Sequence, residues 1–306
     1  MNILLAGASG QLGQELLPKL QRLGCVISVD RELAEQGRQG IEQDLADLNR
    51  VEILLNRNRP DLIVNAAAYT AVDRAESDPF PAFRVNAELP GCLARWAERN
   101  ERLLLHYSTD YVFDGASERP YVEQDQTGPR NVYGESKLAG EWAIVASRCR
   151  HFILRTSWVY SAHGNNFVLS MLRLARERPA LNVVSDQTGC PTWARNLARV
   201  SVQLVEAVRT TAADKVTWGI YHYCDASALS WYDFARTIFG MAAELGLLAR
   251  LPDMTAVKST EYPQTAERPL YSVLDTSAIR RAFDVEPAAL EPSLRACLEE
   301  LKRNDD

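Results

Sequence analysis

Short apolar runs alternate with longer amphipathic stretches through the first half of the chain. Buried strands are predicted for the apolar runs Asn2–Ala6, Cys25–Val29, Asp61–Asn65, Arg102–Tyr107 and His151–Thr156. Between them, apolar residues recur at helical spacing in Gln11–Leu23, Leu48–Arg57, Pro79–Asn100 and Tyr133–Ala146. Strands separated by helices imply right-handed crossovers, so the expected fold class is α/β, with a Rossmann-type doubly wound parallel sheet.

The pattern is less regular in the second half. Helices are predicted at Asn166–Glu177, Ala194–Arg209, Trp231–Leu245 and Leu290–Leu301, and strands at Leu181–Val184 and Ile220–Cys224. Prolines at positions 252, 263 and 269 interrupt the pattern further on. We therefore predict a dinucleotide-binding domain of residues 1–156 and roughly 194–224. A smaller C-terminal substrate-binding lobe would comprise roughly 157–193 and 225–306.

Composition narrows the possible partners. The net charge of −6 argues against nucleic acid and against anionic membrane surfaces. No apolar run is long enough to span a bilayer, and a cytoplasmic location is expected. The six cysteines are scattered without a C-x-x-C pair, which in a chain of 306 residues indicates reduced, mostly buried thiols.

A glycine-rich turn follows the first predicted strand and opens the first predicted helix. It contains Gly7, Gly10, Gln11, Leu12 and Gly13. Glycine lets the backbone bend sharply and approach a pyrophosphate closely, and the helix N-terminus offers N–H groups and a positive dipole end. The turn therefore predicts a site for a nicotinamide dinucleotide.

The second predicted strand is followed by Asp30 and Arg31, which bear on the choice between NADH and NADPH. A carboxylate here can accept hydrogen bonds from both ribose hydroxyls of NADH and repels a 2′-phosphate. Arg31 could instead pair with the 2′-phosphate of NADPH. Asp30 could also be a solvated carboxylate at a strand end. The pattern favours NADH without excluding NADPH.

Two further segments are candidates for the cofactor site. Asp44 and Leu45 follow a presumed third strand, where an aspartate can bond the adenine amino group. The run from Asn65 to Thr70, which includes Ala68 and Tyr69, ends another strand. Its small side chains would let sugar and pyrophosphate lie against the backbone, although plain strand-end packing would explain them too.

A tyrosine and a lysine four residues apart suggest a proton donor. Tyr133 and Lys137 would share one face of a helix. Tyrosine is a poor acid at neutral pH, and a neighbouring ammonium lowers its pKa. The fourth predicted strand ends at Tyr107-Ser108-Thr109-Asp110, where ligands bind in α/β sheets. The Thr109 hydroxyl could there hold the carbonyl oxygen that Tyr133 protonates.

Together these motifs resemble the extended short-chain dehydrogenase/reductases, and within them the dTDP-4-dehydrorhamnose reductases. The resemblance spans nearly the whole chain. Its motifs are Gly7-x-x-Gly10-x-x-Gly13, Asn65–Asp73, Ser108–Phe113, Asn131–Gly134 with Lys137, Arg155–Tyr160, Gly164–Phe167, Asp186–Thr192 and Arg268-Pro269.

The resemblance implies an activity and roles for individual residues. It implies NAD(P)H-dependent reduction of the 4-keto group of dTDP-4-dehydro-L-rhamnose, a small-molecule nucleotide sugar. Tyr133 would be the proton donor, Lys137 would position the nicotinamide ribose and tune Tyr133, and Thr109 would help bind the carbonyl. The remaining implied contacts are Thr109, Asp110 and Trp158 to the sugar, and Tyr107, Ala68, Tyr69 and Thr70 to the cofactor.

Three residues of the second half are further candidates for substrate binding. The Arg268 guanidinium could grip a diphosphate bidentately, or could simply be exposed in a loop. Asn166 and Phe167 open a helix and offer an N-cap and an apolar ring for a base or sugar, although a cap alone would explain the asparagine. Trp158 could stack on the sugar or fill the core.

The sequence also departs from the pattern of this family. Tyr69 stands where some relatives have histidine. Some relatives place acidic groups where Arg195 stands and use them around a metal at a dimer contact. An arginine is no metal ligand, so Mg²⁺ is not supported here, and the chain could be a monomer or a homodimer.

Other functions fit parts of the same pattern. Nucleotide-sugar dehydratases carry Thr-Asp-Glu where this chain has Thr109-Asp110-Tyr111, so elimination of water is poorly provided for. Another keto-reductase or a 4-epimerase remains an alternative. A non-catalytic subunit, similar to the regulatory subunit of methionine adenosyltransferase, would not need an acid–base pair.

Overall fold

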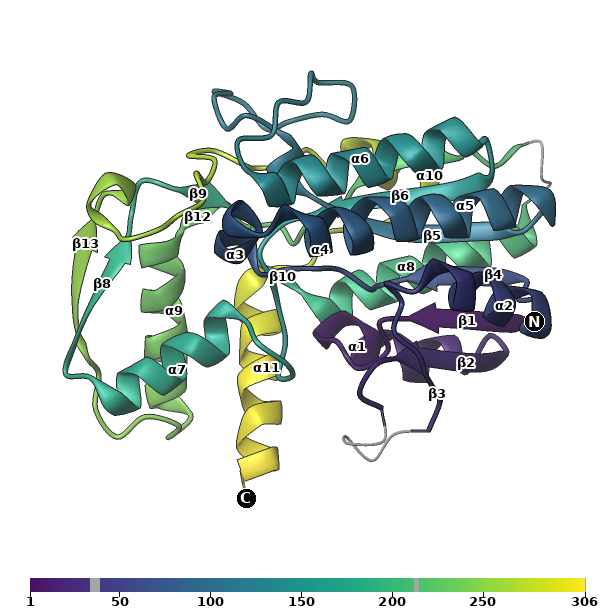
Figure 1. Cartoon of the computed structure of the whole chain (residues 1–306). Helices are drawn as coiled ribbons and strands as arrows, with labels where there is room; N and C mark the ends of the chain where they lie inside the picture. The colour runs from purple at the N-terminus through teal and green to yellow at the C-terminus, as the bar shows by residue number, and fades with distance from the viewer. Residues whose placement is uncertain (34–38, 212–214, 306) are drawn as a thin grey trace.

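A seven-stranded parallel sheet forms the centre of the larger part of the molecule (Figure 1). The structure, a computed structural model, describes residues 1–33, 39–211 and 215–305. The strand order is β11-β6-β5-β4-β1-β2-β3, and every neighbouring pair is parallel. The strands are β1 (Asn2–Ala6), β2 (Cys25–Asp30), β3 (Ile41–Glu42), β4 (Leu62–Asn65), β5 (Leu103–Thr109), β6 (Arg150–Thr156) and β11 (Gly219–His222). The predicted Rossmann-type fold is confirmed.

Helices cover both faces of this sheet because its strands alternate apolar side chains between two cores. Ile3 and Leu5 of β1 join one core, with α1 (Gln11–Leu20), α8 (Ala194–Thr210) and α10 (Ser277–Phe283). Leu4 and Ala6 join the other, with α2 (Leu48–Asn58), α5 (Leu89–Arg99) and α6 (Val132–Ser147). Burial on both faces is typical of a parallel sheet and accounts for the nearly continuous apolar strands.

The segment predicted as one long helix, Pro79–Asn100, is interrupted. It consists of α4 (Pro79–Phe83), a π-helical turn η1 (Arg84–Glu88) and α5. The short helix α3 (Val72–Ser77) comes just before it. Apolar periodicity does not reveal a π-turn, which adds one residue to a single helical turn. The other predicted elements of this half differ from the observed ones only at their ends.

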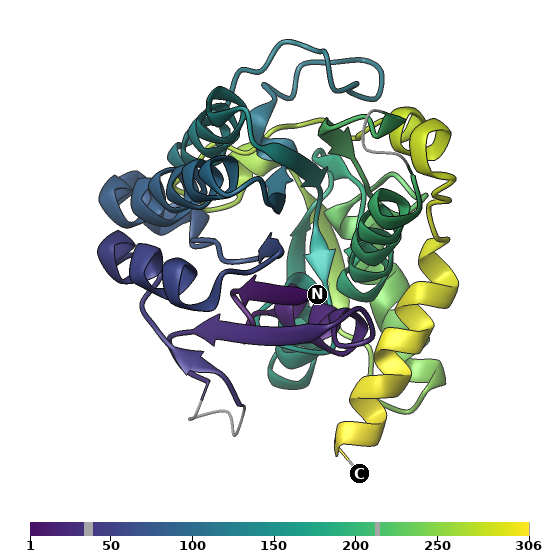
Figure 2. The same ribbon diagram turned by 90° about the vertical axis from the view of Figure 1, so that its right-hand side faces the viewer.

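A third core forms the smaller part of the molecule, which lies at the left in Figure 1 and largely behind the central sheet in Figure 2. Its residues lie between Tyr160 and Trp193 and between Phe234 and Leu298, within or next to the predicted lobe, whose boundaries stay a prediction. Its helices are α7 (Phe167–Glu177), α9 (Trp231–Glu244) and α11 (Leu290–Asp305). Its strands pair as β8 (Ala180–Val184) with β13 (Asp253–Val257), β7 (Val159–Tyr160) with β10 (Thr192–Trp193), and β9 (Thr188–Gly189) with β12 (Leu229–Ser230).

Two general expectations can be compared with the structure. All six cysteines are unpaired, and all except Cys25 are buried, as predicted. Among the described residues, no helix is both long and apolar enough to cross a membrane.

Candidate active site

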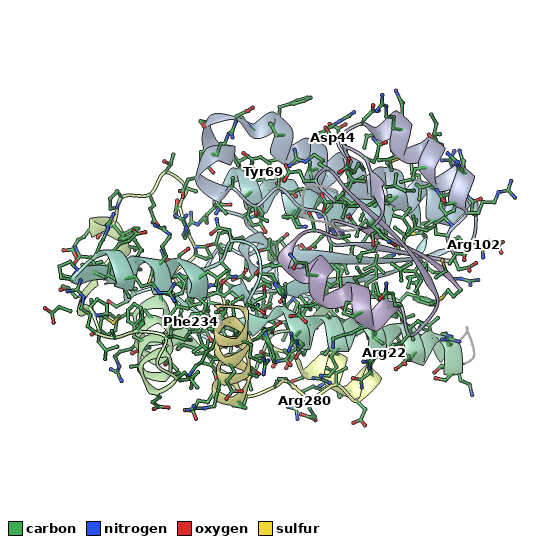
Figure 3. All side chains as sticks on the ribbon, turned by 90° about the horizontal axis from the view of Figure 1, so that it is seen from below. Arg22, Asp44, Tyr69, Arg102, Phe234 and Arg280 are labelled. Atoms are coloured by element: carbon green, nitrogen blue, oxygen red, sulfur yellow. The ribbon has the colours of Figure 1, made fainter. Side chains whose placement is uncertain are left out.

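The largest candidate site lies where the strand order changes direction, between β1 and β4. A cavity of about 640 Å³ opens there, at the carboxyl ends of β1, β2 and β4. In an open α/β sheet this crevice is where ligands bind. Figure 3 shows two of the lining residues, Asp44 and Tyr69, at the same edge of the molecule. The predicted cofactor residues that line the cavity are Gly7, Gly10, Asp30, Arg31, Asp44, Leu45, Ala68 and Tyr69.

The glycine turn packs so closely against neighbouring backbone that no side chain fits at two of its positions. Gly7 has a φ of +80°, and a Cβ there would lie 2.5 Å from the Ala67 nitrogen. A Cβ on Gly13 would lie 2.1 Å from the Gly7 carbonyl oxygen, so the turn and α1 pack backbone to backbone. Gly10 caps α1 without a side-chain hydrogen bond. The first N–H groups of α1 can therefore bind a pyrophosphate, and the turn fits a dinucleotide.

Asp30 is tied to the glycine turn. One carboxylate oxygen accepts hydrogen bonds from the Ser9 nitrogen at 2.9 Å and the Ser9 hydroxyl at 2.6 Å, and the other accepts from the Arg31 nitrogen at 2.8 Å. These bonds give Asp30 a structural task that the sequence did not indicate. Ribose hydroxyls would have to share this carboxylate with Ser9.

The remaining predicted cofactor residues lie outside the lining of this cavity. Leu12 is buried in the core under α1, and the Gln11 side chain donates a hydrogen bond to the Val159 carbonyl at 3.3 Å. Thr70 is exposed beside Tyr69. The Tyr107 hydroxyl donates to the Ser201 hydroxyl at 2.7 Å, so its ring faces α8. Only the backbone carbonyl of Tyr107 approaches the predicted catalytic lysine.

Several residues that sequence reasoning did not single out also line or shape the cavity. Arg74, Phe80 and Arg84 line it from α3, α4 and η1. Asn86, in the π-turn, exchanges two hydrogen bonds with the Tyr69 backbone, at 2.9 and 3.0 Å. Its amide also donates to the Ser136 hydroxyl on α6 at 3.0 Å, which joins the cofactor turn to the helix of Tyr133. A lone asparagine in a predicted helix gives no such signal.

The three predicted catalytic residues meet at the carboxyl end of β5. The Thr109 hydroxyl accepts a hydrogen bond from the Tyr111 nitrogen at 3.2 Å and begins the short 3-10 helix η2 (Asp110–Val112). The Tyr133 hydroxyl interacts with the Thr109 side chain. Lys137 is 2% exposed, and its Nζ donates to the Tyr107 carbonyl at 2.6 Å. A threonine, a tyrosine and a lysine therefore share one small site.

The protonation of this site follows from burial. Burial raises the pKa of Tyr133 to about 12, although the hydrogen bond with Thr109 opposes the rise. Burial also lowers the pKa of Lys137 to about 8, against the influence of Glu141. Tyr133 therefore holds its proton at neutral pH. The expected lowering of its pKa by Lys137 is outweighed by burial in this structure, where the ammonium is directed at the Tyr107 carbonyl.

Asp110 adds a buried carboxyl group to the same site. Its side chain is 2% exposed and accepts a hydrogen bond from the Thr109 hydroxyl at 3.0 Å. Burial raises the pKa of Asp110 to about 6, and hydrogen bonding with Ser272, Thr109 and Ser157 limits the rise. A carboxyl group tuned in this way beside a tyrosine is typical of a functional site.

A second cavity, of about 210 Å³, lies in the smaller part of the molecule. It is lined by Phe167, Gln187, Trp231 and Arg268, among others. Arg268 forms an ion pair with Asp73 of α3, with Nη2 at 2.7 Å from Oδ2 and Nη1 at 3.3 Å from Oδ1. Asp73 therefore fixes the guanidinium at the edge of this cavity, a role that the sequence did not indicate.

The other predicted substrate residues have different surroundings. Trp158 has a φ of +45°, and its ring stacks on Trp231 with centroids 3.4 Å apart. Asn166 caps α7: its Oδ1 accepts from the Leu169 nitrogen at 3.2 Å, and its Nδ2 donates to the Ser161 and His163 carbonyls. The capping interpretation therefore accounts for the side-chain bonds of Asn166.

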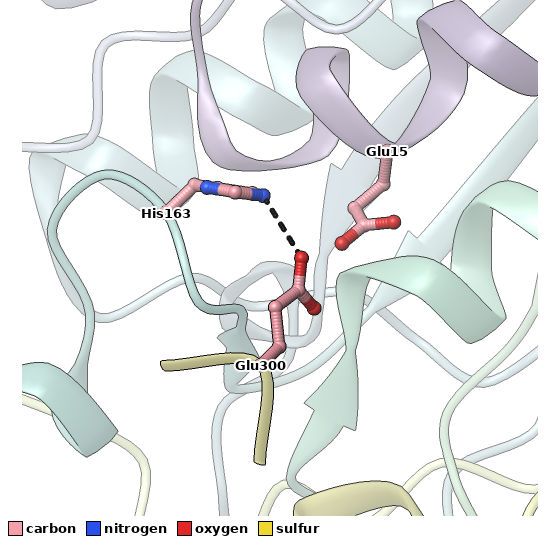
Figure 4. A group of neighbouring side chains, drawn as sticks. All are labelled: Glu15, His163 and Glu300. Atoms are coloured by element: carbon pink, nitrogen blue, oxygen red, sulfur yellow. Dashed lines mark ion pairs between the residues drawn. The ribbon is translucent and has the colours of Figure 1, made fainter. Parts of the chain in front are cut away.

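One group of ligand-type side chains could be mistaken for a metal site. Ligand atoms of Glu15, His163 and Glu300 lie within 4.8 Å of one another (Figure 4). The Arg195 guanidinium, however, bonds to both carboxylates, at 2.9 and 3.1 Å from Glu15 and at 2.6 Å from Glu300. The positive charge that a divalent ion would bring is already supplied, so these residues do not fit a metal.

We therefore expect divalent ions to change neither the stability nor the activity of the protein. Since a bound ion stabilises the folded state in proportion to its affinity, neither EDTA nor millimolar MgCl₂ should move the thermal midpoint or the activity. The measurement is differential scanning fluorimetry together with turnover, after dialysis against each. A thermal midpoint that falls in EDTA and recovers with Mg²⁺ would contradict this expectation. The control variant is Arg195→Gln, which removes the positive charge paired with the Glu15 and Glu300 carboxylates.

The fold and this site define the class of the protein: an extended short-chain dehydrogenase/reductase with a dinucleotide site and a Thr-Tyr-Lys group. The family model for the RmlD substrate binding domain matches residues 1–303. The chain belongs to that family.

Known members of this family are similar over their whole length. The dTDP-4-dehydrorhamnose reductase of Burkholderia thailandensis is 41% identical, covering 98% of this chain and 99% of that protein. The enzyme of the same name from Salmonella typhimurium is 40% identical, covering 98% of each. Among solved structures, a reductase of this name from Bacillus anthracis in complex with NADP has a TM-score of 0.85 at 31% identity, covering 98% of this chain and 99% of that one.

Proposed function

We propose that the protein reduces the 4-keto group of dTDP-4-dehydro-L-rhamnose with NAD(P)H and forms dTDP-L-rhamnose. The observation that carries this proposal is the grouping of Thr109, Tyr133 and Lys137 at the end of β5, on the same edge of the sheet as the dinucleotide cavity. The support for this substrate is the identity of 40–41% over 98% of the chain to reductases that carry its name.

The chemistry needs one hydride and one proton. The nicotinamide cofactor supplies the hydride that adds to C4 of the sugar. The Tyr133 hydroxyl would donate to the ketone oxygen, and the Thr109 hydroxyl, which donates to Asp110 in the structure, would turn its proton to the same oxygen. The Tyr133 proton moves to that oxygen as the C=O π electrons become a lone pair. The Lys137 ammonium then stabilises the phenolate left on Tyr133.

The sugar nucleotide would extend from this point towards the smaller part of the molecule. Asp110 and Trp158 would contact the sugar, and Phe167 would offer an apolar face to the base or sugar. Arg268 would pair with the diphosphate, for which its guanidinium would have to give up part of its bidentate contact with Asp73. Asn166 would act indirectly, by capping the helix that carries Phe167.

Two other functions are less well supported. Dehydration of the sugar needs a second acid–base carboxylate beside Asp110, but that position is Tyr111, whose ring packs edge-on against Tyr133 with centroids 5.8 Å apart. A non-catalytic subunit would gain nothing from a buried ammonium beside a tyrosine, because burying a charge is costly. The proposed reaction uses both groups.

The assay follows NADPH or NADH absorbance with purified protein and dTDP-4-dehydrorhamnose generated in situ. We expect rapid oxidation that depends on the keto sugar, and a product that co-elutes with dTDP-L-rhamnose. Omission of the keto sugar is the control for background oxidation.

If NADH and NADPH both bind tightly but neither is oxidised in the presence of the keto sugar, this reductase function is excluded. Since nicotinamide dinucleotides and nucleotide sugars are metabolites of the cytoplasm, the proposed function places the protein there.

A further inference from the structure

A buried ion pair lies one helical turn beyond the catalytic lysine. Tyr133, Lys137 and Glu141 follow one another at intervals of four residues on α6, so they share one face of the helix. Glu141 and Arg155, on β6, are 1% and 4% exposed. The Arg155 Nε lies 2.9 Å from Oε1 of Glu141, and Nη2 lies 2.7 Å from Oε2, which is a bidentate arrangement.

Stability alone does not explain this pair. Removing two charges from water costs about as much as their attraction returns, and apolar side chains of similar size often stabilise a core as well or better. Ile144 and Ile153, on the same face of the sheet, belong to an apolar core, beside which His106 and His151 are also buried. The buried pair therefore points to a task that an apolar pair could not perform.

Lys137 is the group that needs this carboxylate. Its ammonium has three N–H donors, and the described structure gives it one acceptor, the Tyr107 carbonyl. Burial opposes its charge, and Glu141 is the neighbour that favours it. Arg155 is fixed in turn, because its guanidinium lies 5.1 Å from the centre of the Phe113 ring and donates to the Glu123 carbonyl at 3.4 Å.

We propose that Glu141, clamped by Arg155, is a positioning residue that keeps the Lys137 ammonium charged on the helix face that it shares with Tyr133. This inference rests on the reductase function proposed above. It adds to the Thr-Tyr-Lys group two residues that touch neither substrate nor cofactor. Arg155 fixes the position of the Glu141 carboxylate, and this carboxylate provides the negative charge that favours the Lys137 ammonium.

The other titratable groups near Lys137 do not replace Glu141. His106 on β5 interacts with Lys137 electrostatically, but its pKa lies well below its usual value because it is fully buried, so it is neutral at working pH. Other titratable groups on the elements around Lys137 include Tyr133 and Glu135 on α6, Tyr107 on β5, Asp110 and Tyr111 of η2, and His151 and Arg155 on β6. Of all these groups, Glu141 and His106 are the ones whose charge is coupled to that of Lys137.

The expected effect has a definite sign. The pKa of Lys137 is about 8, and Glu141 raises it against burial. Removing the carboxylate should lower that pKa, so the ammonium would be lost at a lower pH. A downward shift of one unit would leave about a tenth of Lys137 charged at pH 8 instead of half, and kcat at that pH would fall about fivefold.

The test uses the double variant Glu141→Gln/Arg155→Gln, because the single change would leave Arg155 buried without a partner and could unfold the protein. The control is Glu135→Gln, which removes an exposed carboxylate from the first turn of the same helix. The chain has five lysines, so ¹³Cε labelling of lysine resolves their titrations, and Lys137→Arg identifies the Lys137 signal.

We expect Lys137 to titrate near pH 8 in the wild type and in Glu135→Gln, and at a lower pH in the double variant. The alkaline limb of the kcat profile should move by the same amount. Coincident Lys137 titrations in the folded double variant and the wild type would overturn the proposal. If the wild type reduces no keto sugar while the titration still shifts, the function proposed above fails and the role of Glu141 stands.

Discussion

Replacing Tyr133 with phenylalanine should lower kcat for the keto reduction by about 10²–10⁴-fold, the usual contribution of a positioned general acid. The ring and its packing against Tyr111 are retained in this variant, so the change removes the hydroxyl group alone. The measurement is steady-state NADPH oxidation, with cofactor affinity determined separately by fluorescence. Affinity for the cofactor should change little.

The matched control is Tyr107→Phe. The Tyr107 hydroxyl bonds to Ser201 in the core under α8, and its backbone carbonyl, which holds Lys137, is unaffected by the substitution. This variant should keep kcat within about threefold of the wild type, as expected for one buried hydrogen bond remote from the reaction. Equal losses in the two variants would show that Tyr133 acts through packing and is not the acid.

The first half of the fold could be predicted because its strands are short apolar runs between amphipathic helices. Such a pattern leaves few topologies, since parallel strands need right-handed crossovers. The smaller part was harder to predict. Strands such as β9 and β12 have two residues each, too few to show alternation, and β13 is largely exposed. These elements depend on tertiary pairing, which a single sequence does not reveal.

The residues of the site also divide into those that the sequence predicts and those that it does not. Gly7, Thr109 and Tyr133 were found because each stands at a strand end or helix start where chemistry needs that residue type. Ser9, Asp73 and Asn86 were missed, because their functions depend on partners far away in the chain or on a π-turn. Arg155 belonged to a motif of the family, yet its partner Glu141 became visible only when α6 was packed on β6.

For two residues, Asp30 and Lys137, the structure differs from the role that the sequence predicts. Asp30 was considered as a ligand of the cofactor ribose, and its two oxygens are already engaged by Ser9 and Arg31. Lys137 was expected to lower the pKa of Tyr133, but burial raises that pKa instead. Sequence spacing shows which groups can meet, whereas pKa values depend on solvent exposure, which requires the packed structure.

Asp110→Asn should make the protein more stable and less active at the same time. The pKa of Asp110 is raised from 3.8 to about 6 by burial, so the folded state binds this proton more tightly than the unfolded chain does. The ionised carboxylate therefore destabilises the fold: the cost grows between pH 3.8 and about pH 6 and is fully present at pH 8. A difference of about two pKa units corresponds to about 3 kcal/mol of unfolding free energy at pH 8, and to about half of that at pH 5.

Asparagine removes this cost because it carries no charge, and it can still accept the hydrogen bond from Thr109. Urea unfolding at pH 8 should show a gain of about 1–3 kcal/mol, which shrinks towards pH 5. Asp114→Asn is the opposite control: hydrogen bonds from Tyr121 and Ala116 lower the pKa of Asp114, so its ionised form stabilises the fold and its loss should destabilise it at pH 8.

Turnover should fall in Asp110→Asn because the carboxylate stands where the sugar is proposed to bind, beside the Thr109 hydroxyl. A stabilised but slower enzyme would mean that Asp110 is retained for function at the expense of stability, as is common for buried charges in active sites. A variant that is less stable than the wild type at pH 8 would instead make Asp110 a structural residue, and its contact with the sugar would lose its support.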